Sequence, residues 1–311
     1  MSIRRGPWRR GRLLAALSLL LGLFMLLHLR IPNRIGNLGS LVDTFLPWFG
    51  LFIPVLLVGA LGRRSIPAMI ALLLPIAVWL NLFGGLLSDK SHPGGDLTVA
   101  SQNVGADNPD PAGTARDVAA SGVDLLALEE LTPQATSKCK QALATTYRYH
   151  VVQGTVGLWS KLPLSDTQPV DIGMDSTRAL RTTVTTDHGS LAVYVAHLGS
   201  VRVLPRNGFW TAQRDAGVRT LGKAIAAEQN QRVVLLGDLN GTTNDRALAD
   251  LTSQMHSAQD AAGAGFGFSW PARSPVARID HILVRGVEPE SAWVLPATDS
   301  DHRPVAAEIS W

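Results

Sequence analysis

Three long apolar stretches near the start of the chain constrain its fold more than any other feature. They span Leu13–Leu29, Phe45–Leu61 and Ile66–Leu87, and none of them contains a charged residue. Each has about the length needed to cross ~30 Å of hydrocarbon at ~1.5 Å per residue. Pro54 and Pro75 fall inside the second and third stretches, where membrane helices tolerate proline. The pattern predicts three transmembrane helices, at about 13–29, 45–61 and 66–87.

The basic residues around these stretches predict how they are oriented. Five arginines precede the first stretch, and Arg63 and Arg64 separate the second from the third. Arg30 and Arg34 lie between the first and second, and Lys90 follows the third. Because cytoplasmic loops are enriched in Lys and Arg, we expect a cytoplasmic N-terminus and an extracytoplasmic chain after residue 90. The arginine-rich start also fits a cleaved signal peptide, which would leave two spans in the membrane.

The 311-residue chain carries its charge in two unlike parts. Residues 1–95 hold ten of the 28 Lys and Arg and two of the 25 Asp and Glu, so residues 96–311 hold 18 basic and 23 acidic residues, a net charge of −5. The segment Ser88–Gly95 is short, polar and rich in Gly and Pro, as linkers are. We therefore expect a membrane anchor over 1–87, a linker over 88–95 and a separate domain over 96–311. The single cysteine, Cys139, excludes an intramolecular disulfide, and we expect its role to be structural.

After the linker, short β-like runs alternate with turns and a few helical stretches. The expected strands are 97–103, 123–128, 148–152, 157–160, 181–186, 191–197, 233–236, 279–284 and 306–309. The expected helices are 112–121, 133–144 and 207–228. The turn at 187–190 predicts a β-hairpin, so antiparallel pairing should accompany the βα units. The pattern indicates an α/β domain with mixed rather than purely parallel sheets.

Polar side chains recur at the ends of these apolar strands. They are Asn103, Glu129, Glu130, His197, Asp238, Asn240, Asp280, Asp301 and His302. Acids and amides at such positions are costly unless they are solvated, paired or bound to a metal. Taken singly, each is typical of a turn, a cap or a solvated strand end. Their number and order instead predict one polar cleft in which several strand ends converge.

The segments SQNV, LALEEL, VAHL, LLGDLN, RIDHI and SDHRPV together resemble the endonuclease/exonuclease/phosphatase superfamily over the whole domain. This superfamily includes deoxyribonuclease-like nucleases, inositol polyphosphate 5-phosphatases and neutral sphingomyelinases. The resemblance implies a four-layer α/β sandwich of two packed mixed sheets flanked by helices. It also implies a phosphoric ester hydrolase that uses a divalent cation, usually Mg²⁺, with Mn²⁺ as the alternative. One or two metal ions are both compatible with the motifs.

The resemblance assigns metal ligands by motif position. Asn103 and Glu130 would hold the metal, and Asp301 would lie at or near it. Glu130 is preferred over Glu129 because the family pattern is Gln-Glu with the second residue as the ligand. This chain has Glu129 where Gln is usual, which would place an extra charge near the metal.

The remaining motif residues would act on the phosphate and the attacking water. Asp238 would orient or deprotonate the water, and Asn240 would donate hydrogen bonds to phosphate oxygens. His302 would pair with Asp280, either as a base or as a charged clamp, and His197 would contact a non-bridging phosphate oxygen. Further candidates for phosphate contact are Arg178, Arg181 and Arg214.

The acidic balance of residues 96–311 and the short tether favour a phosphate ester embedded in the membrane over DNA, which proteins bind through several Lys and Arg contacts. The layout of three helices followed by an outward domain resembles actinobacterial membrane proteins linked to teicoplanin resistance. That resemblance implies cell-envelope lipid phosphates as substrates. An extracytoplasmic nuclease is the alternative enzyme. A catalytically inactive binding module on a membrane anchor is the alternative outside enzymes, although every motif residue is present.

Overall fold

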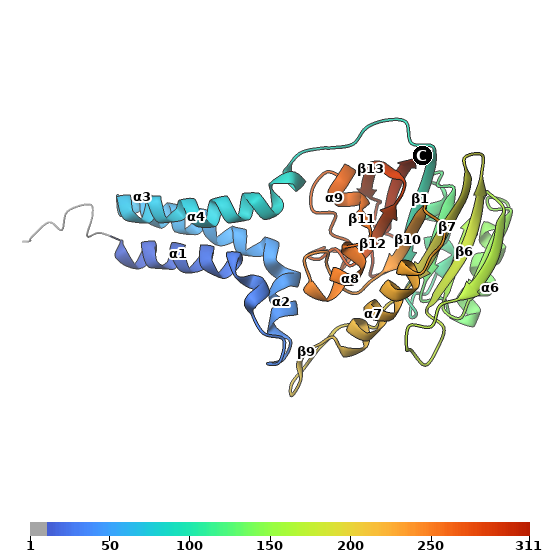
Figure 1. Ribbon diagram of the computed structural model, residues 1–311, viewed down its shortest axis with the longest axis horizontal. Coiled ribbons are helices and arrows are strands. Elements are labelled where there is room, and N and C mark those ends of the chain that lie inside the picture. Colours follow the sequence, from blue (N-terminus) through green and yellow to red (C-terminus); the bar gives the residue numbers. More distant parts are fainter. Residues whose placement is uncertain (1–10) are drawn as a thin grey trace, which may run out of the picture.

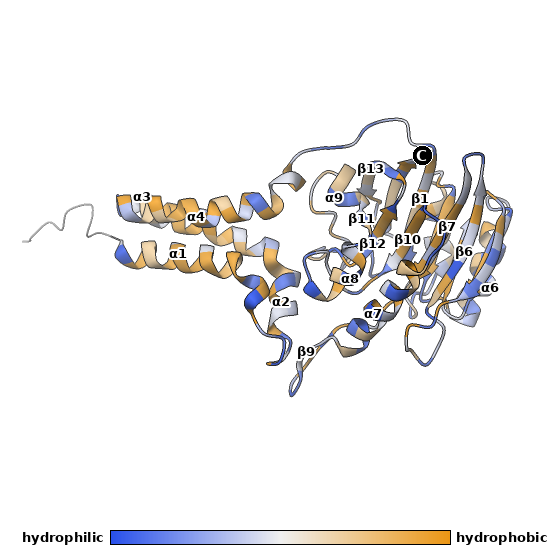
Figure 2. Cartoon of the chain, viewed as in Figure 1, coloured by the Kyte–Doolittle hydropathy of each residue, from blue (hydrophilic) through white to orange (hydrophobic). Residues whose placement is uncertain are grey.

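The computed structural model describes residues 11–311, so the predicted cytoplasmic arginines Arg4, Arg5, Arg9 and Arg10 lie outside the described residues. Three N-terminal helices lie side by side and project away from an α/β domain (Figure 1). They are α1 (Arg12–Leu26), α3 (Phe52–Gly62) and α4 (Ile66–Phe83). Their residues are mostly hydrophobic along the whole bundle (Figure 2).

The prediction of three spans is confirmed only in part. Two helical segments, Leu38–Gly62 and Ile66–Leu87, are long and apolar enough to cross a membrane. Over the described residues, α1 is a helix of 15 residues, about 22 Å long and short of ~30 Å of hydrocarbon. It ends before the predicted boundary at Leu29 because His28 starts a 3₁₀ turn and bonds Asp43 at 2.7 Å.

The ends of these helices place basic residues together. α1 begins, α3 ends and α4 begins at the end of the bundle that points away from the α/β domain (Figure 1). Arg12, Arg63 and Arg64 therefore lie at this far end. The short helix α2 (Leu38–Phe45) and the 3₁₀ turn Leu46–Leu51 lie at the opposite end, beside the domain.

The α/β domain contains two six-stranded sheets. The first has the order β13-β14-β1-β2-β4-β3 and the second β11-β12-β10-β7-β6-β5. Their strands are β1 (Leu97–Asn103), β2 (Leu125–Glu129), β3 (Tyr149–Gln153), β4 (Val156–Ser160), β5 (Leu164–Pro169), β6 (Ala179–Thr186), β7 (Gly189–Ala196), β10 (Val233–Asp238), β11 (His256–Ser257), β12 (Asp280–Arg285), β13 (Glu288–Val294) and β14 (Val305–Ser310). In these sheets the pairs β1–β2 and β7–β10 are parallel and the other named pairs are antiparallel, so both sheets are mixed as expected.

Alternating apolar residues place the sheets face to face. Side chains such as Val99, Leu158 and Val193 form the central core between the sheets. The outer face of the first sheet is covered by α5 (Pro111–Ala119) and α6 (Pro133–Leu143). The outer face of the second is covered by α7 (Ala212–Ala226) and α8 (Ala249–Thr252), and a further short helix is α9 (Ala258–Ala262). This is the predicted sandwich of two mixed sheets flanked by helices, with Cys139 buried in the outer core.

Most of the expected strands form within two residues of their predicted bounds. The helix expected from residue 207 instead begins at Ala212, because Gly208–Trp210 forms β9 against β8 (Arg202–Leu204). This hairpin is held by the N-terminal region: the Phe209 N–H donates to the Gly36 carbonyl at 2.9 Å. Gly36 is distant from this hairpin in the sequence, so the local pattern around residues 202–210 does not predict the pairing.

Candidate active site

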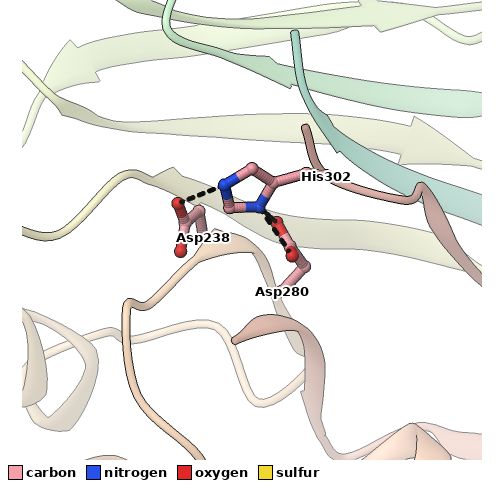
Figure 3. A group of neighbouring side chains, drawn as sticks. All are labelled: Asp238, Asp280 and His302. Carbon is pink, nitrogen blue, oxygen red and sulfur yellow. Dashed lines mark hydrogen bonds and ion pairs between the residues drawn. The ribbon is translucent and has the colours of Figure 1, made fainter. Parts of the chain in front are cut away.

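The end of each strand that carries a predicted site residue lies at one edge of the sandwich. Asn103 ends β1, Asp238 ends β10, and His197 directly follows β7. Asp280 begins β12 and pairs in register with Asp238 across the antiparallel ladder. Because β7 and β10 run parallel and β12 runs the other way, their site residues meet at the same edge. His302 enters from the loop before β14 to complete the group (Figure 3).

His302 is bound on both sides by carboxylates (Figure 3). Its Nδ1 lies 2.9 Å from Asp280 Oδ2 and 3.1 Å from Oδ1, and its Nε2 lies 3.8 Å from Asp238 Oδ2. Burial acts to lower the pKa of His302, but the two carboxylates outweigh it and raise the pKa to about 10. The imidazole therefore carries a positive charge at neutral pH, which suits a clamp for negative charge better than a base.

Asp238 is buried and held by two donors. Its Oδ1 accepts from the Asn240 N–H at 2.9 Å, and its Oδ2 accepts from Asn103 Nδ2 at 3.0 Å. Burial raises the pKa of Asp238 to about 7, although the charge of His302 opposes the rise. A carboxyl that titrates near neutrality is matched to taking a proton from water and releasing it again.

Glu130 and His197 form a second contact next to this group. Glu130 follows β2 in a left-handed conformation, with a φ of 57°, and its carboxylate lies 3.5 Å from His197 Nε2. Burial opposes ionisation of Glu130, but the His197 imidazole and the Ala106 N–H outweigh it and lower the pKa of the carboxyl. Burial lowers the pKa of His197 to about 4, so this imidazole is neutral at pH 7. Within residues 11–311, neither ring nitrogen of His197 has a hydrogen-bond partner.

The donor set fits a divalent cation. The potential ligand atoms of Asp238, Asp280 and His302 all lie within 4.8 Å of one another, and the His302 imidazole could bind a metal only after it loses a proton. The predicted ligands Asn103 and Glu130 border this group through the Asn103–Asp238 hydrogen bond and the Glu130–His197 contact. Amide and carboxylate oxygens are the ligands that Mg²⁺ prefers. His197 lacks a hydrogen bond at either ring nitrogen among the described residues, although its Nε2 lies 3.5 Å from Glu130 and 3.7 Å from Asp238.

Two of the predicted site residues make less direct contributions. The side chain of Asp301 is exposed, and its backbone carbonyl accepts from the Ala272 N–H at 2.7 Å. The Asn240 amide Nδ2 donates to the Leu198 carbonyl at 3.0 Å. Asn240 nevertheless lies two residues from Asp238 and bonds its carboxylate through the backbone.

Glu129 differs from the expectation of an extra charge near the metal. Its side chain is fully buried and accepts from the Ser101 hydroxyl at 2.9 Å. Burial raises its pKa well above the usual range, and the carboxylates of Asp280 and Asp238 raise it further. Both effects favour the protonated form of the Glu129 carboxyl, which would resemble the neutral Gln that the family pattern has at this position.

The three candidate arginines have different surroundings. The Arg178 carbonyl accepts from the His197 N–H at 2.8 Å, so Arg178 lies beside the cleft. Arg181, which lies on β6, instead forms an ion pair with Glu228, with Nε 2.9 Å from Oε2. Arg214 is buried, and its ion pair with Asp245 and its 3.1 Å bond to the Asn240 carbonyl make it a support for the loop after β10.

Ser300 has a structural role in the site that the sequence analysis did not single out. Its hydroxyl donates to the Asn103 carbonyl at 2.6 Å and accepts from the His302 N–H at 3.1 Å. Ser300 thus joins the end of β1 to the loop that carries His302. In the sequence, the sign of this role is that Ser300 directly precedes the motif residues Asp301 and His302.

Comparisons with known proteins agree with this geometry. Residues 100–302 match the model of the Endonuclease/Exonuclease/phosphatase family. Comparison with curated protein sequences gives no match. The fold is similar to the mannosyl-6-phosphatase Bt3783 of Bacteroides thetaiotaomicron, with a TM-score of 0.58 and 16% identity over 70% of this chain and 100% of that one. It is also similar to humanized D. rerio TDP2, with a TM-score of 0.57 and 19% identity over 69% of this chain and 99% of that one. The family match and the buried Asp–His cluster show that the chain is a hydrolase that belongs to the endonuclease/exonuclease/phosphatase family.

Proposed function

We propose that this phosphoesterase is anchored in the membrane, depends on a divalent metal, and hydrolyses phosphate ester or diphosphate bonds of lipid-linked substrates. The observation that carries the hydrolytic part is the cluster of Asp238, Asp280 and His302 with His197 and Asn103 beside it. Asn103 and Glu130, with Asp301 nearby, would hold Mg²⁺. The metal, when bound, supplies positive charge that polarises a phosphoryl oxygen.

Each residue then has a defined task in an in-line displacement. Asp238 orients the attacking water and accepts its proton, because its carboxylate is held by Asn103 and the Asn240 backbone. His302, kept cationic by Asp280, stabilises charge that develops on the phosphoryl oxygens. The neutral His197 imidazole and the Asn240 amide provide further hydrogen-bonding groups for those oxygens. Arg178 is a candidate for an additional contact.

The docking of the domain on its anchor supports a substrate in the membrane. The segments that contact the anchor follow β7 and β10 or precede β12, so they flank the site residues. Asp245 accepts from Ser40 at 3.0 Å, and the Gly265 N–H donates to the Leu86 carbonyl at 2.8 Å. The Trp48 indole donates to the Val276 carbonyl at 2.8 Å. Loops that adjoin the site strands β10 and β12 therefore also contact the apolar N-terminal helices.

The proposed orientation places the domain outside the cytoplasm. Arg12, Arg63 and Arg64 share the end of the helix bundle far from the domain. Because basic residues favour the cytoplasmic face, that end would be cytoplasmic and the domain extracytoplasmic. An enzyme in this position has access to cell-envelope lipid phosphates such as polyprenyl diphosphates. Such substrates would also fit the teicoplanin-resistance type of protein.

A nuclease remains the second candidate because a protein of similar fold, D. rerio TDP2, has been solved in complex with a single-stranded DNA product.

The experiment that decides between the lipid phosphoesterase and the nuclease uses full-length protein in liposomes with Mg²⁺. Polyprenyl diphosphate in the bilayer and plasmid in solution are each tested at low and high salt, with Asp238→Asn as the inactive control. We expect EDTA-sensitive lipid hydrolysis that exceeds plasmid nicking. Plasmid nicking that weakens steeply with salt, without lipid hydrolysis, would establish the nuclease. No hydrolysis of either would favour a binding module.

A further inference from the structure

An apolar cavity of about 420 Å³ lies where the anchor meets the α/β domain. Its walls come from both parts: Trp48 and Ile53 from the turn and helix after α2, Trp79 and Leu80 from the last turns of α4, and Phe266 and Phe268 from the domain. The volume falls within the range of ~300–1,000 Å³ typical of pockets for small organic ligands. The cavity is thus a shared feature of two regions that are distant in the sequence.

The polar atoms of its aromatic walls are already satisfied. The Trp48 indole N–H donates to the Val276 carbonyl at 2.8 Å, and that of Trp79 donates to the Pro47 carbonyl at 2.9 Å. The Trp48 ring stacks on Phe268 with centroids 5.5 Å apart. The indoles therefore contribute their apolar surfaces, and water, which needs several polar partners, is poorly suited to such a cavity.

The cavity is lined by the apolar helices on one side, and on the other by a segment that supports the active site. Its anchor walls belong to the two segments that are apolar enough to span a membrane, and the side chains of Leu51 and Leu80 at its rim are exposed. Tryptophans at the ends of membrane helices are typical of the bilayer interface. On the other side, Phe268 directly precedes Ser269, whose hydroxyl accepts from the Asp280 N–H at 3.3 Å.

We propose that this cavity binds the hydrocarbon chain of the lipid-linked phosphate whose head group is hydrolysed at the adjacent site. The inference rests on the proposed function and specifies its substrate as a single lipid drawn partly out of the bilayer. A chain leaving the bilayer gains little from the hydrophobic effect, because lipid tails are as apolar as the cavity. Its binding depends instead on packing against the rigid aromatic walls. The cavity therefore acts by positioning the phosphate beside Asp280 and His302.

Photolabelling tests occupancy independently of hydrolysis. Full-length protein in liposomes is exposed to hexadecyl phosphate that carries a photoreactive diazirine in its chain. We expect saturable labelling at Trp48, Ile53 and Phe268, which excess unlabelled hexadecyl phosphate removes.

Leu80→Trp should fill the cavity and lower this labelling about tenfold, as overpacking of an occupied pocket predicts. Leu73→Trp is the matched control, since Leu73 is an exposed residue of the same helix that does not line the cavity. Labelling that does not saturate, or that Leu80→Trp leaves unchanged, would overturn the inference.

A chain-length comparison separates this inference from the proposed function. Hydrolysis of hexadecyl and ethyl 4-nitrophenyl phosphate is measured for the wild type and both variants. We expect Leu80→Trp to reduce the ratio of the hexadecyl to the ethyl rate about tenfold, and Leu73→Trp to leave the ratio unchanged. Equal ratios in all three proteins would contradict a chain-binding cavity while leaving the hydrolase intact. Saturable labelling without hydrolysis of any phosphate ester would instead refute the proposed function and retain the lipid site.

Discussion

Arg246 provides the most direct test of how the domain is docked on its anchor. Its Nε donates to Asp43 Oδ2 at 2.9 Å, and its two terminal nitrogens donate to the carbonyls of His28, Leu29 and Ile31 at 2.7–2.8 Å. The side chain of Asp43 is fully buried. Arg246→Ala would therefore leave one buried carboxylate without its cation and three carbonyls without this donor.

The expected loss of docking free energy in Arg246→Ala follows from the removal of one partner of this ion pair. Such truncations cost about 3–5 kcal/mol when the remaining charge is left buried and uncompensated. Asp43 keeps its 2.7 Å bond to His28, and the Arg246 side chain is 24% exposed, so we expect a cost at the lower end, about 3 kcal/mol. At ~1.4 kcal/mol for each factor of ten, the docking equilibrium should shift by a hundredfold or more toward the undocked form. Residues 88–95 would keep the released domain close to the N-terminal helices, so we expect a loss of orientation rather than of attachment.

Amide hydrogen exchange on the full-length protein measures this shift. In Arg246→Ala we expect faster exchange in Leu38–Phe45 and Arg202–Trp210, which lie at the junction, while β10 stays protected. Arg232→Ala is the matched control, because Arg232 lies over the Trp311 ring at 5.2 Å, away from the anchor contacts. Unchanged exchange at the junction would refute the view that this ion pair holds the domain in place. An equal loss of protection in β10 would indicate general unfolding instead.

Three further predictions concern catalysis, stability and orientation. Asp238→Asn and His302→Ala should each lower the hydrolytic rate at least ~10²-fold while the fold is retained, and near-normal turnover of either would contradict its role. Burial acts to raise the pKa of Glu228, but hydrogen bonds, chiefly from Arg181, outweigh it and bring the pKa to about 2, below its ordinary 4.5. This carboxylate therefore stabilises the fold above pH 4.5 and loses its contribution as the pH falls toward 2, so Glu228→Gln should cost about 2 kcal/mol in denaturant unfolding at pH 7 and little at pH 2. An equal cost at both pH values would exclude the ion pair as the cause. Finally, a reporter fused after Trp311 should be active only outside the cytoplasm, and a cytoplasmic signal would reverse the proposed topology.

The sequence predicted the central strands well because their pattern arises locally. β1 forms over Leu97–Asn103 as expected, and its apolar residues are buried between other layers. The edge strands β5 and β13 were not predicted, because half-exposed edges such as Leu164–Pro169 lack a clear alternation of apolar residues. β8 and β9 were missed because their hairpin depends on Gly36 in the anchor.

The candidate site shows the same division between local and distant information. The order of the motifs anticipated that Asp238, Asp280 and His302 would meet, since each lies at a strand end or in the adjoining loop. The raised pKa of Glu129 could not be read from the sequence, because it results from burial and from the nearby carboxylates of Asp280 and Asp238. Arg214 looked like a phosphate contact on its own, but the partners that engage it, Asp245 and the Asn240 carbonyl, become neighbours only in the folded chain.

The contact between the loops that adjoin the active site and the N-terminal helices also limits where the proposed enzyme can work. A domain fixed by Arg246, Ser40 and the Trp48 indole cannot turn its cleft toward a second, facing bilayer. Hydrolysis would therefore occur only in cis, on lipids of the leaflet in which the protein itself resides. The relevant concentration is then the mole fraction of substrate in that leaflet. Diluting the vesicles would leave the rate unchanged, whereas adding inert lipid to the same vesicles would lower it.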